Sequence, residues 1–176
     1  MKEKVLVIGG AGYLGSVLTG RLLDEGYNVR ILDSFIYGRR SVERYQNDDR
    51  VEIIEGDIRN IETVHLAIRD SSSAVLLAAV VGDPASKARP EQTVETNFLA
   101  AQVVASSAKL AGVKRFLYAS TCSVYGVGSE ILDEEAPLNP VSLYAKTKIS
   151  SEESIMGIAD GNFKPVIMRM STLYGW

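Results

Sequence analysis

The chain contains 176 residues, of which 46% are apolar and 23% charged, and its formal net charge is −3. These values are ordinary for a globular protein, and the length suits one domain, 1–176, around a single core. The weak acidity and the lack of a Lys/Arg cluster argue against a nucleic-acid surface. One Cys and one His exclude a His/Cys zinc cluster and an internal disulfide, so we expect no metal. No apolar run reaches membrane-spanning length and no signal peptide precedes the first strand, so we expect a cytoplasmic protein without a membrane partner.

The first residues carry a pattern that predicts a dinucleotide site. Val5–Ile8 is a short, β-branched apolar run, typical of a strand buried on both faces. It leads directly into the spacing G-x-x-G-x-x-G at Gly9, Gly12 and Gly15, and apolar residues then recur at helical intervals from Leu14. Glycines in such a turn let the backbone approach a pyrophosphate, while the helix N-terminus supplies free N–H donors and positive potential.

The second strand strengthens this interpretation. Asn28–Leu32 is followed by Asp33, 18 residues after Gly15. A carboxylate at this point accepts hydrogen bonds from both hydroxyls of an adenosine ribose and repels a 2′-phosphate. The sequence therefore predicts a site that prefers NAD over NADP. The alternative is a glycine-rich turn built for tight packing, followed by an ordinary loop Asp.

A third strand is expected at Val51–Glu55, after a loop over Ser34–Arg40 and a short helical segment over Ser41–Gln46. In a doubly wound sheet the loops at the carboxyl ends of the strands face the cofactor. Asp57, just after this strand, is therefore placed to accept a hydrogen bond from the adenine amino group. It is equally suited to cap a helix over Ile61–Ile68, and the sequence leaves both interpretations open.

The remaining elements complete an α/β fold, a doubly wound Rossmann sheet of six parallel strands with right-handed crossovers and helices on both faces. Pro90 suits the first turn of a long helix and Gly112 its end. Asn97 lies inside that helix, where an amide among small apolar residues needs a reason. The expected elements are strands at Ala74–Val81, Lys114–Ala119 and Pro165–Met170, helices at Glu91–Ala111 and Ser142–Met156, and an acidic loop at Glu130–Asn139.

Tyr144 and Lys148 lie four residues apart on the Ser142–Met156 helix, so they share one face. A free tyrosine has a pKa of about 10 and is a poor base at neutral pH. A nearby ammonium favours the phenolate, so Lys148 is expected to lower the pKa of Tyr144 and make it a general base for an alcohol. The hydroxyls of Ser120 and Thr121, at the end of the fifth strand, are placed to hold the same oxygen. The alternative is a solvated helix face.

In motif order the chain resembles the extended short-chain dehydrogenase/reductases, and among them the nucleotide-sugar epimerases and dehydratases. The resemblance implies that Tyr144 is the catalytic base, that Lys148 also binds the nicotinamide ribose, and that Thr121 holds the catalytic Ser/Thr position beside Ser120. It rests on Gly9–Gly15, Asp33, Gly56–Asp57, Asn97, Ser120–Gly126, Tyr144–Lys148 and Arg169–Gly175. The NAD contacts that it implies are Gly9, Gly12, Tyr13, Leu14, Gly15, Asp33, Ser34, Asp57, Ile58, Ala78, Ala79, Asn97 and Lys148.

The chain departs from the family pattern at two points. The dehydratase branch carries an Asp-Glu pair after the Thr, whereas this chain has Cys122 and Ser123, neither of which replaces a carboxylic acid at neutral pH. Dehydration is therefore disfavoured, and Cys122 is interpreted as a small apolar filler beside the cofactor rather than as a nucleophile. The sequence also ends at Trp176, directly after the strand and turn that lead into the family's substrate-binding domain, so we expect that domain to be missing.

Three functions follow from these residues. The first is the NAD-binding part of a nucleotide-sugar 4-epimerase-like enzyme acting on a UDP-, dTDP- or GDP-sugar. The second is an NAD(P)H-dependent reductase of a keto-sugar, which Arg39 and Arg40 keep open. The third is a non-catalytic dinucleotide sensor. In the family, dimers pack through the helices at 91–111 and 142–156, so a homodimer is also expected.

Overall fold

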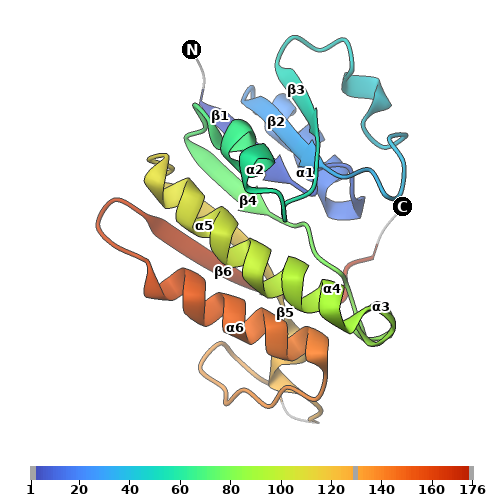
Figure 1. Ribbon diagram of the computed structural model, residues 1–176, viewed down its shortest axis with the longest axis vertical. Coiled ribbons are helices and arrows are strands. Elements are labelled where there is room, and N and C mark those ends of the chain that lie inside the picture. The colour runs from blue at the N-terminus through green and yellow to red at the C-terminus, as the bar shows by residue number, and fades with distance from the viewer. Residues whose placement is uncertain (1–2, 129–130, 175–176) are drawn as a thin grey trace.

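Six parallel strands form one sheet in the order β3-β2-β1-β4-β5-β6 in a computed structural model that describes residues 3–128 and 131–174 (Figure 1). The order reverses between β1 and β4, and ligands of open α/β sheets bind beyond the carboxyl ends of the strands at such a point. This confirms the predicted Rossmann sheet. The strands are β1 Lys4–Ile8, β2 Asn28–Asp33, β3 Val51–Glu55, β4 Ser73–Leu76, β5 Arg115–Thr121 and β6 Lys164–Met170.

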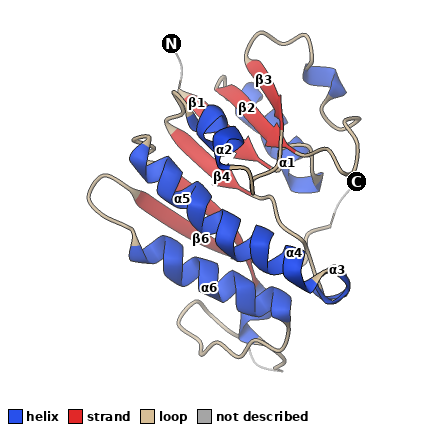
Figure 2. Cartoon of the chain, viewed as in Figure 1, coloured by secondary structure: helices blue, strands red, loops and turns tan. Residues whose placement is uncertain are grey.

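Helices cover the two faces unequally (Figure 2). On one face α2, α5 and α6 enclose a core that includes Leu6, Val104 and Phe116, all fully buried. On the other face α1 and the 3₁₀ turn η1 pack a second cluster around Val7 and Ile31. The helical segments are α1 Tyr13–Asp24, η1 Glu43–Tyr45, α2 Ile61–Ile68, α3 Asp83–Ala88, α4 Pro90–Val94, η2 Glu95–Ala100, α5 Ala101–Leu110, η3 Cys122–Tyr125 and α6 Leu143–Gly157.

Strand β4 is shorter than the predicted Ala74–Val81 because the ladder with β1 ends at Leu76. The N–H groups of Leu77 and Ala78 both donate to the Ile8 carbonyl, at 2.8 and 3.0 Å, where β1 turns into the glycine loop. The apolar run after Leu76 therefore leaves the sheet, and the chain forms α3, a helix that the sequence pattern did not predict. An apolar run alone does not distinguish a strand from the buried loop that follows it.

The predicted helix over Glu91–Ala111 is present, but its middle is a π-helix, η2. It begins at Pro90 and ends before Gly112, whose φ of +81° stops the helix as predicted. The carbonyl of Asn97 in η2 accepts a hydrogen bond from Ser151 Oγ at 2.6 Å. A π-turn frees backbone groups for such side-chain partners, and it commonly marks a functional position.

Other boundaries differ by a few residues. The segment expected over Ser41–Gln46 narrows to η1, and β5 extends through Thr121, so Ser120 and Thr121 are its last residues. Glu130 of the predicted loop and Gly175 of the last motif lie outside the described residues. Across 3–128 and 131–174, no helix is long and apolar enough to cross a membrane.

Candidate nucleotide-binding and catalytic site

The glycine loop between β1 and α1 is a cradle that side chains would fill. Gly9 has a φ of +85°, and a Cβ there would lie 2.7 Å from the backbone nitrogen of Ala78. A Cβ on Gly15 would lie 2.2 Å from the Gly9 carbonyl oxygen. Gly12 is the N-cap of α1 and offers no side-chain cap, so the first N–H groups of the helix face the crevice, beside Tyr13 and Leu14. This cradle fits the pyrophosphate of a dinucleotide.

Asp33 at the end of β2 is held beside the cradle by backbone donors. Its Oδ2 accepts from Ala11 N and its Oδ1 from Phe35 N, each at 2.9 Å. A carboxylate accepts about four hydrogen bonds, so each oxygen keeps a free lone pair for ribose hydroxyls. Ser34, the next residue, is exposed beside it. The Arg39 guanidinium pairs with Glu55 at the surface and stacks 4.3 Å from the Phe35 ring centroid.

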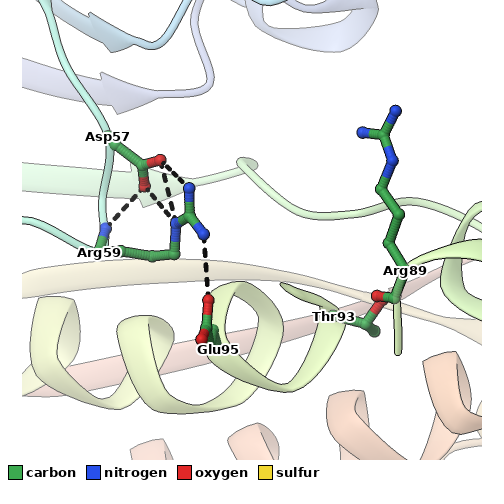
Figure 3. A network of polar contacts seen from close by, with 5 residues as sticks. All are labelled: Asp57, Arg59, Arg89, Thr93 and Glu95. Atoms are coloured by element: carbon green, nitrogen blue, oxygen red, sulfur yellow. Dashed lines mark hydrogen bonds and ion pairs between the residues drawn. The ribbon is translucent and has the colours of Figure 1, made fainter. Parts of the chain in front are cut away.

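Asp57 lies at the carboxyl end of β3 and is bound by Arg59 (Figure 3). Arg59 Nη2 contacts Asp57 Oδ2 at 2.7 Å, and its Nη1 reaches Glu95 Oε2 on η2 at 3.0 Å. The hydrogen bonds from Arg59 hold the pKa of Asp57 below its ordinary value, with burial opposing. The capping interpretation of Asp57 is wrong: Asn60 is the N-cap of α2, and its Oδ1 accepts from Thr63 N at 3.0 Å. The role of Asp57 toward adenine stays a prediction.

The loop after β4 brings further predicted contacts to the same crevice. Ala78 packs against Gly9, and Ala79 follows it. The Asn97 amide holds this loop from η2: its Oδ1 accepts from Val80 N at 2.7 Å and its Nδ2 donates to Val80 O at 2.9 Å. Asn97 therefore anchors the loop after β4 through Val80, and its own contact with the cofactor stays a prediction. Ile58, also predicted as a cofactor contact, has its side chain in the core.

Tyr144 and Lys148 project from α6 toward the end of β5, and Ser142 caps this helix by accepting from Ala145 N at 3.1 Å. Lys148 is 3% exposed, donates from Nζ to the Ala119 carbonyl at 2.8 Å, and lies 4.6 Å from the Tyr118 ring centroid. Burial lowers the pKa of Lys148 to about 7, with the Glu152 carboxylate opposing that shift.

The expected lowering of the Tyr144 pKa is not present in the protein alone. Tyr144 is 8% exposed, and burial raises its pKa above the ordinary value of 10. The nearby Thr121 hydroxyl opposes this shift by hydrogen bonding, and the Asp83 carboxylate of α3 adds to it. Because the Lys148 ammonium lies 5.8 Å from the Tyr144 ring centroid and has itself a depressed pKa, it does not dominate the tyrosine.

Ser120 and Thr121 point to different partners, although they are neighbours. Thr121 Oγ1 donates to Ser123 Oγ and accepts from Ser123 N, both at 3.1 Å, close to Tyr144. Ser120 Oγ instead donates to the Glu152 carboxylate, which binds Arg169 of β6. Only Thr121 thus joins Tyr144 and Lys148 in one cluster, while Ser120 belongs to the group behind it.

Cys122 is exposed and lines a pocket of about 350 Å³ together with Tyr125, Leu132 and Arg169. Cys122 opens η3 directly after β5, and its expected place beside the cofactor stays a prediction. Among the described residues, no group of three or more His, Cys, Asp or Glu side chains is arranged to hold a metal ion.

Glu152 and the partners that bury it are functional candidates beyond those predicted from the sequence. Their signal was available, since Tyr144, Lys148 and Glu152 follow one another at intervals of four residues and so share one helix face. Arg59 was also missed, although it lies two residues after Asp57.

A parallel sheet with a glycine cradle at its switch point and a Tyr–Lys pair beside the end of β5 defines a dinucleotide-binding protein of the Rossmann class. The comparison with protein families agrees: the model of the "NAD dependent epimerase/dehydratase family" matches residues 5–176. The chain belongs to this family, which confirms the resemblance. A UDP-glucose 4-epimerase of Rhizobium leguminosarum bv. trifolii is 31% identical over 171 residues, covering 95% of this chain and 51% of that protein.

Solved structures show the same relation. A UDP-glucuronic acid 4-epimerase from Bacillus cereus, in complex with NAD, superposes with a TM-score of 0.88 at 29% identity, covering 98% of this chain and 58% of that one. A double mutant of a dTDP-glucose 4,6-dehydratase from Streptomyces venezuelae, with NAD bound, superposes with a TM-score of 0.87 at 31% identity. The match covers 94% of this chain and 54% of that one. The chain spans about half the length of the curated relatives it matches.

Proposed function

We propose that this chain is the NAD-binding and proton-transferring part of a nucleotide-sugar epimerase-like enzyme. The observation that carries the proposal is the cluster of Thr121, Tyr144 and Lys148 at the carboxyl end of β5, on the same edge of the sheet as the glycine cradle. Several of the relatives that match are named as UDP-glucose 4-epimerases and others as decarboxylases, and the family is named as NAD dependent. The substrate class that follows is a UDP-, dTDP- or GDP-sugar.

The residues of the cradle and its rim would hold the cofactor. The N-terminus of α1 and the loop at Gly9, Gly12 and Gly15 would bind the pyrophosphate, and Asp33 the adenosine ribose. When bound, NAD supplies a hydride acceptor that returns the hydride at the end of the cycle.

The catalytic residues handle the proton. Thr121 orients a sugar hydroxyl, and Tyr144 removes its proton as the hydroxyl carbon is oxidised. Protonated Lys148 stabilises the Tyr144 phenolate. Lys148 also binds the nicotinamide ribose, as the family resemblance implies. In a 4-epimerase the resulting keto-sugar would turn in the pocket, so that its other face is presented for the return of the hydride. Dehydration stays disfavoured because Cys122 and Ser123 stand where the dehydratase branch has two acids.

The first test is the nucleotide that purified protein releases on denaturation. Near-stoichiometric NAD or NADH supports a recycled, tightly held cofactor. NADP would overturn the role of Asp33 and favour the keto-sugar reductase. No nucleotide, together with no NAD binding by titration calorimetry, would contradict the proposal for this chain.

The second test, made on the full-length protein, is turnover with UDP-glucose, UDP-galactose and their dTDP- and GDP-counterparts. Tyr144→Phe should lower the rate of interconversion by at least about 100-fold, which is the usual contribution of a general base. Tyr27→Phe, at the opposite edge of the sheet, is the matched control and should retain activity. NAD binding with no turnover on any sugar nucleotide would favour the dinucleotide sensor, and net consumption of NADH would favour the reductase.

We also propose a homodimer through the helices at 91–111 and 142–156, as the family resemblance implies. Leu99 and Met156 are 48% and 49% exposed on these helices, and apolar side chains at such exposure are suited to an interface. Light scattering should give twice the chain mass, falling to a monomer in Leu99→Lys. The expected cytoplasmic location stays a prediction.

A further inference from the structure

Glu152 is an acid buried behind the catalytic cluster. It is 5% exposed on α6, eight residues after Tyr144 and four after Lys148, so the three side chains share one helix face. A carboxylate is seldom buried to this degree unless it is paired, because removing an isolated charge from water is strongly unfavourable. Because Glu152 lies on the same helix face as Tyr144, we looked for a role of its carboxylate in the reaction.

The partners of Glu152 come from the two strands that end at the site. Ser120 Oγ of β5 donates to its Oε1. Arg169 of β6 donates from Nη2 and Nε to its Oε2, at 2.7 and 3.0 Å. Arg169 is fixed in turn, since its Nη1 donates to Tyr125 OH and to the Glu134 carbonyl, both at 3.1 Å. The carboxylate thus joins α6 to β5 and β6 at their carboxyl ends.

We propose that Glu152 is a positioning residue for the reaction. Anchored by Arg169, its carboxylate is the counter-charge that keeps the buried Lys148 ammonium protonated, so that Lys148 acts as a cation toward Tyr144. The inference rests on the proposed function only in assigning Lys148 to the support of Tyr144. The effect of Glu152 on the protonation of Lys148 is a property of the folded chain without substrate or cofactor.

The surroundings of Lys148 leave Glu152 as its anion. Lys148 Nζ has an uncharged carbonyl, that of Ala119, as its hydrogen-bond acceptor. The aromatic faces near it belong to Tyr118 at 4.6 Å and Tyr144 at 5.8 Å. Burial of the ammonium lowers its pKa, and Glu152 is the group that opposes this. Other charged or titratable groups lie on the elements packed against α6. Asp83 and Cys122 act on Tyr144, Glu95 pairs with Arg59, Lys109 with Asp160, Arg115 with Glu3, and Tyr125 with Arg169. Lys87, Glu91 and Lys164 are exposed to solvent.

Substitution of Glu152 and substitution of Arg169 should move the pH midpoint of Lys148 in opposite directions. In Glu152→Gln the negative charge is lost and the Arg169 guanidinium loses its carboxylate partner, so the pH midpoint of Lys148 should fall. In Arg169→Met the carboxylate loses its cation and acts on Lys148 alone, so the midpoint should rise. An opposite charge at close range shifts a pKa by about 1–3 units. Movements of about one pH unit in opposite directions are therefore expected.

The experiment is an NMR titration of the 176-residue chain labelled with ¹³C at the lysine Cε. The Lys148 signal is assigned by its absence in Lys148→Met, and its midpoint in the unsubstituted chain should lie near pH 7. Glu153→Gln is the matched control, because Glu153 is the exposed neighbour on the same helix. It should leave the Lys148 midpoint unchanged.

If Glu152→Gln does not fold, the double variant Glu152→Gln/Arg169→Met replaces it. This variant leaves neither charge of the pair in the interior, a change that proteins often tolerate. Its Lys148 midpoint should lie below that of Arg169→Met.

Midpoints that move together in both single variants, or that do not move, would overturn the proposal. A role limited to packing would lower the unfolding temperature of both variants without opposite shifts. The titration needs neither substrate nor turnover, so it is separate from the proposed function. Opposite shifts in a chain whose Tyr144→Phe variant keeps activity would refute the function alone.

Discussion

Gly15→Ala tests whether the cradle at the start of α1 is as tight as the structure indicates. A Gly-to-Ala change within a helix ordinarily stabilises a protein by about 0.5–1 kcal/mol. At Gly15, however, the new Cβ would lie 2.2 Å from the Gly9 carbonyl oxygen and 2.6 Å from the Gly10 Cα. Both are backbone atoms and cannot rotate away. Overpacking typically destabilises by about 1–3 kcal/mol, so we expect a net loss of about 1–2 kcal/mol.

The same displacement should reach the cofactor, because the Gly9 and Gly10 backbone forms the cradle. We expect NAD affinity to fall by at least about tenfold, which corresponds to 1.4 kcal/mol. Urea unfolding followed by circular dichroism gives the stability, and titration calorimetry gives the affinity. Gly157→Ala is the control, since it lies in α6 with no atom within 4 Å of its Cβ. It should be neutral or stabilising by up to about 1 kcal/mol. A Gly15→Ala protein as stable as Gly157→Ala, with unchanged NAD affinity, would refute this reasoning.

Three further predictions concern groups around the crevice. Asp33→Asn places an amide where two backbone N–H groups donate at 2.9 Å; we expect NAD affinity to fall and the preference over NADP to narrow in parallel titrations, whereas an unchanged ratio would contradict the ribose assignment. Asn97→Ala removes both hydrogen bonds to Val80, so urea unfolding should show a loss of about 1–3 kcal/mol. Lys148→Met should raise the unfolding free energy at pH 7 and below. The pKa of Lys148 lies near 7 in the folded chain, against 10.5 for the ordinary side chain. Keeping the buried amine protonated therefore costs the folded state on the order of 5 kcal/mol. Between these values the unfolded chain binds more protons, so unsubstituted protein gains stability as pH rises from 7 to 10.5 while Lys148→Met does not; parallel stability curves would contradict this.

The fold was predictable because its signals are local. β-branched runs, the glycine spacing, the helix start at Pro90 and the helix end at Gly112 each act over a few residues. The alternation of strands and helices then indicates the doubly wound sheet. The errors arose where contacts distant in sequence decide. Strand β4 ends early because Leu77 and Ala78 bind the end of β1, and η2 forms where Ser151 and Val80 engage Asn97.

The candidate site was predictable in its residue types and less so in its partners. Glycine spacing and Asp33 are read directly from the chain, because their chemistry depends on the backbone next to them. The split between Ser120 and Thr121 was not predictable, since alternate residues of a strand face opposite ways and the strand end was placed two residues early. The raised pKa of Tyr144 depends on burial, which a sequence pattern does not give.

Helix α6 shows how function can be read from a violated rule. A helix that packs on a sheet ordinarily buries an apolar stripe, yet the face of α6 that is buried carries Thr147, Lys148, Ser151 and Glu152 as well as Ile155. Each of the last three polar side chains has a partner: Lys148 the Ala119 carbonyl, Ser151 the Asn97 carbonyl, and Glu152 the Arg169 guanidinium. Polar groups are buried at a net cost unless so paired, and paired groups contribute less than apolar packing of the same volume. A helix with these residues is therefore not the most stable solution for this position. The stability given up on that face places a tyrosine, a lysine and a carboxylate at the ends of β5 and β6, where the proposed chemistry needs them.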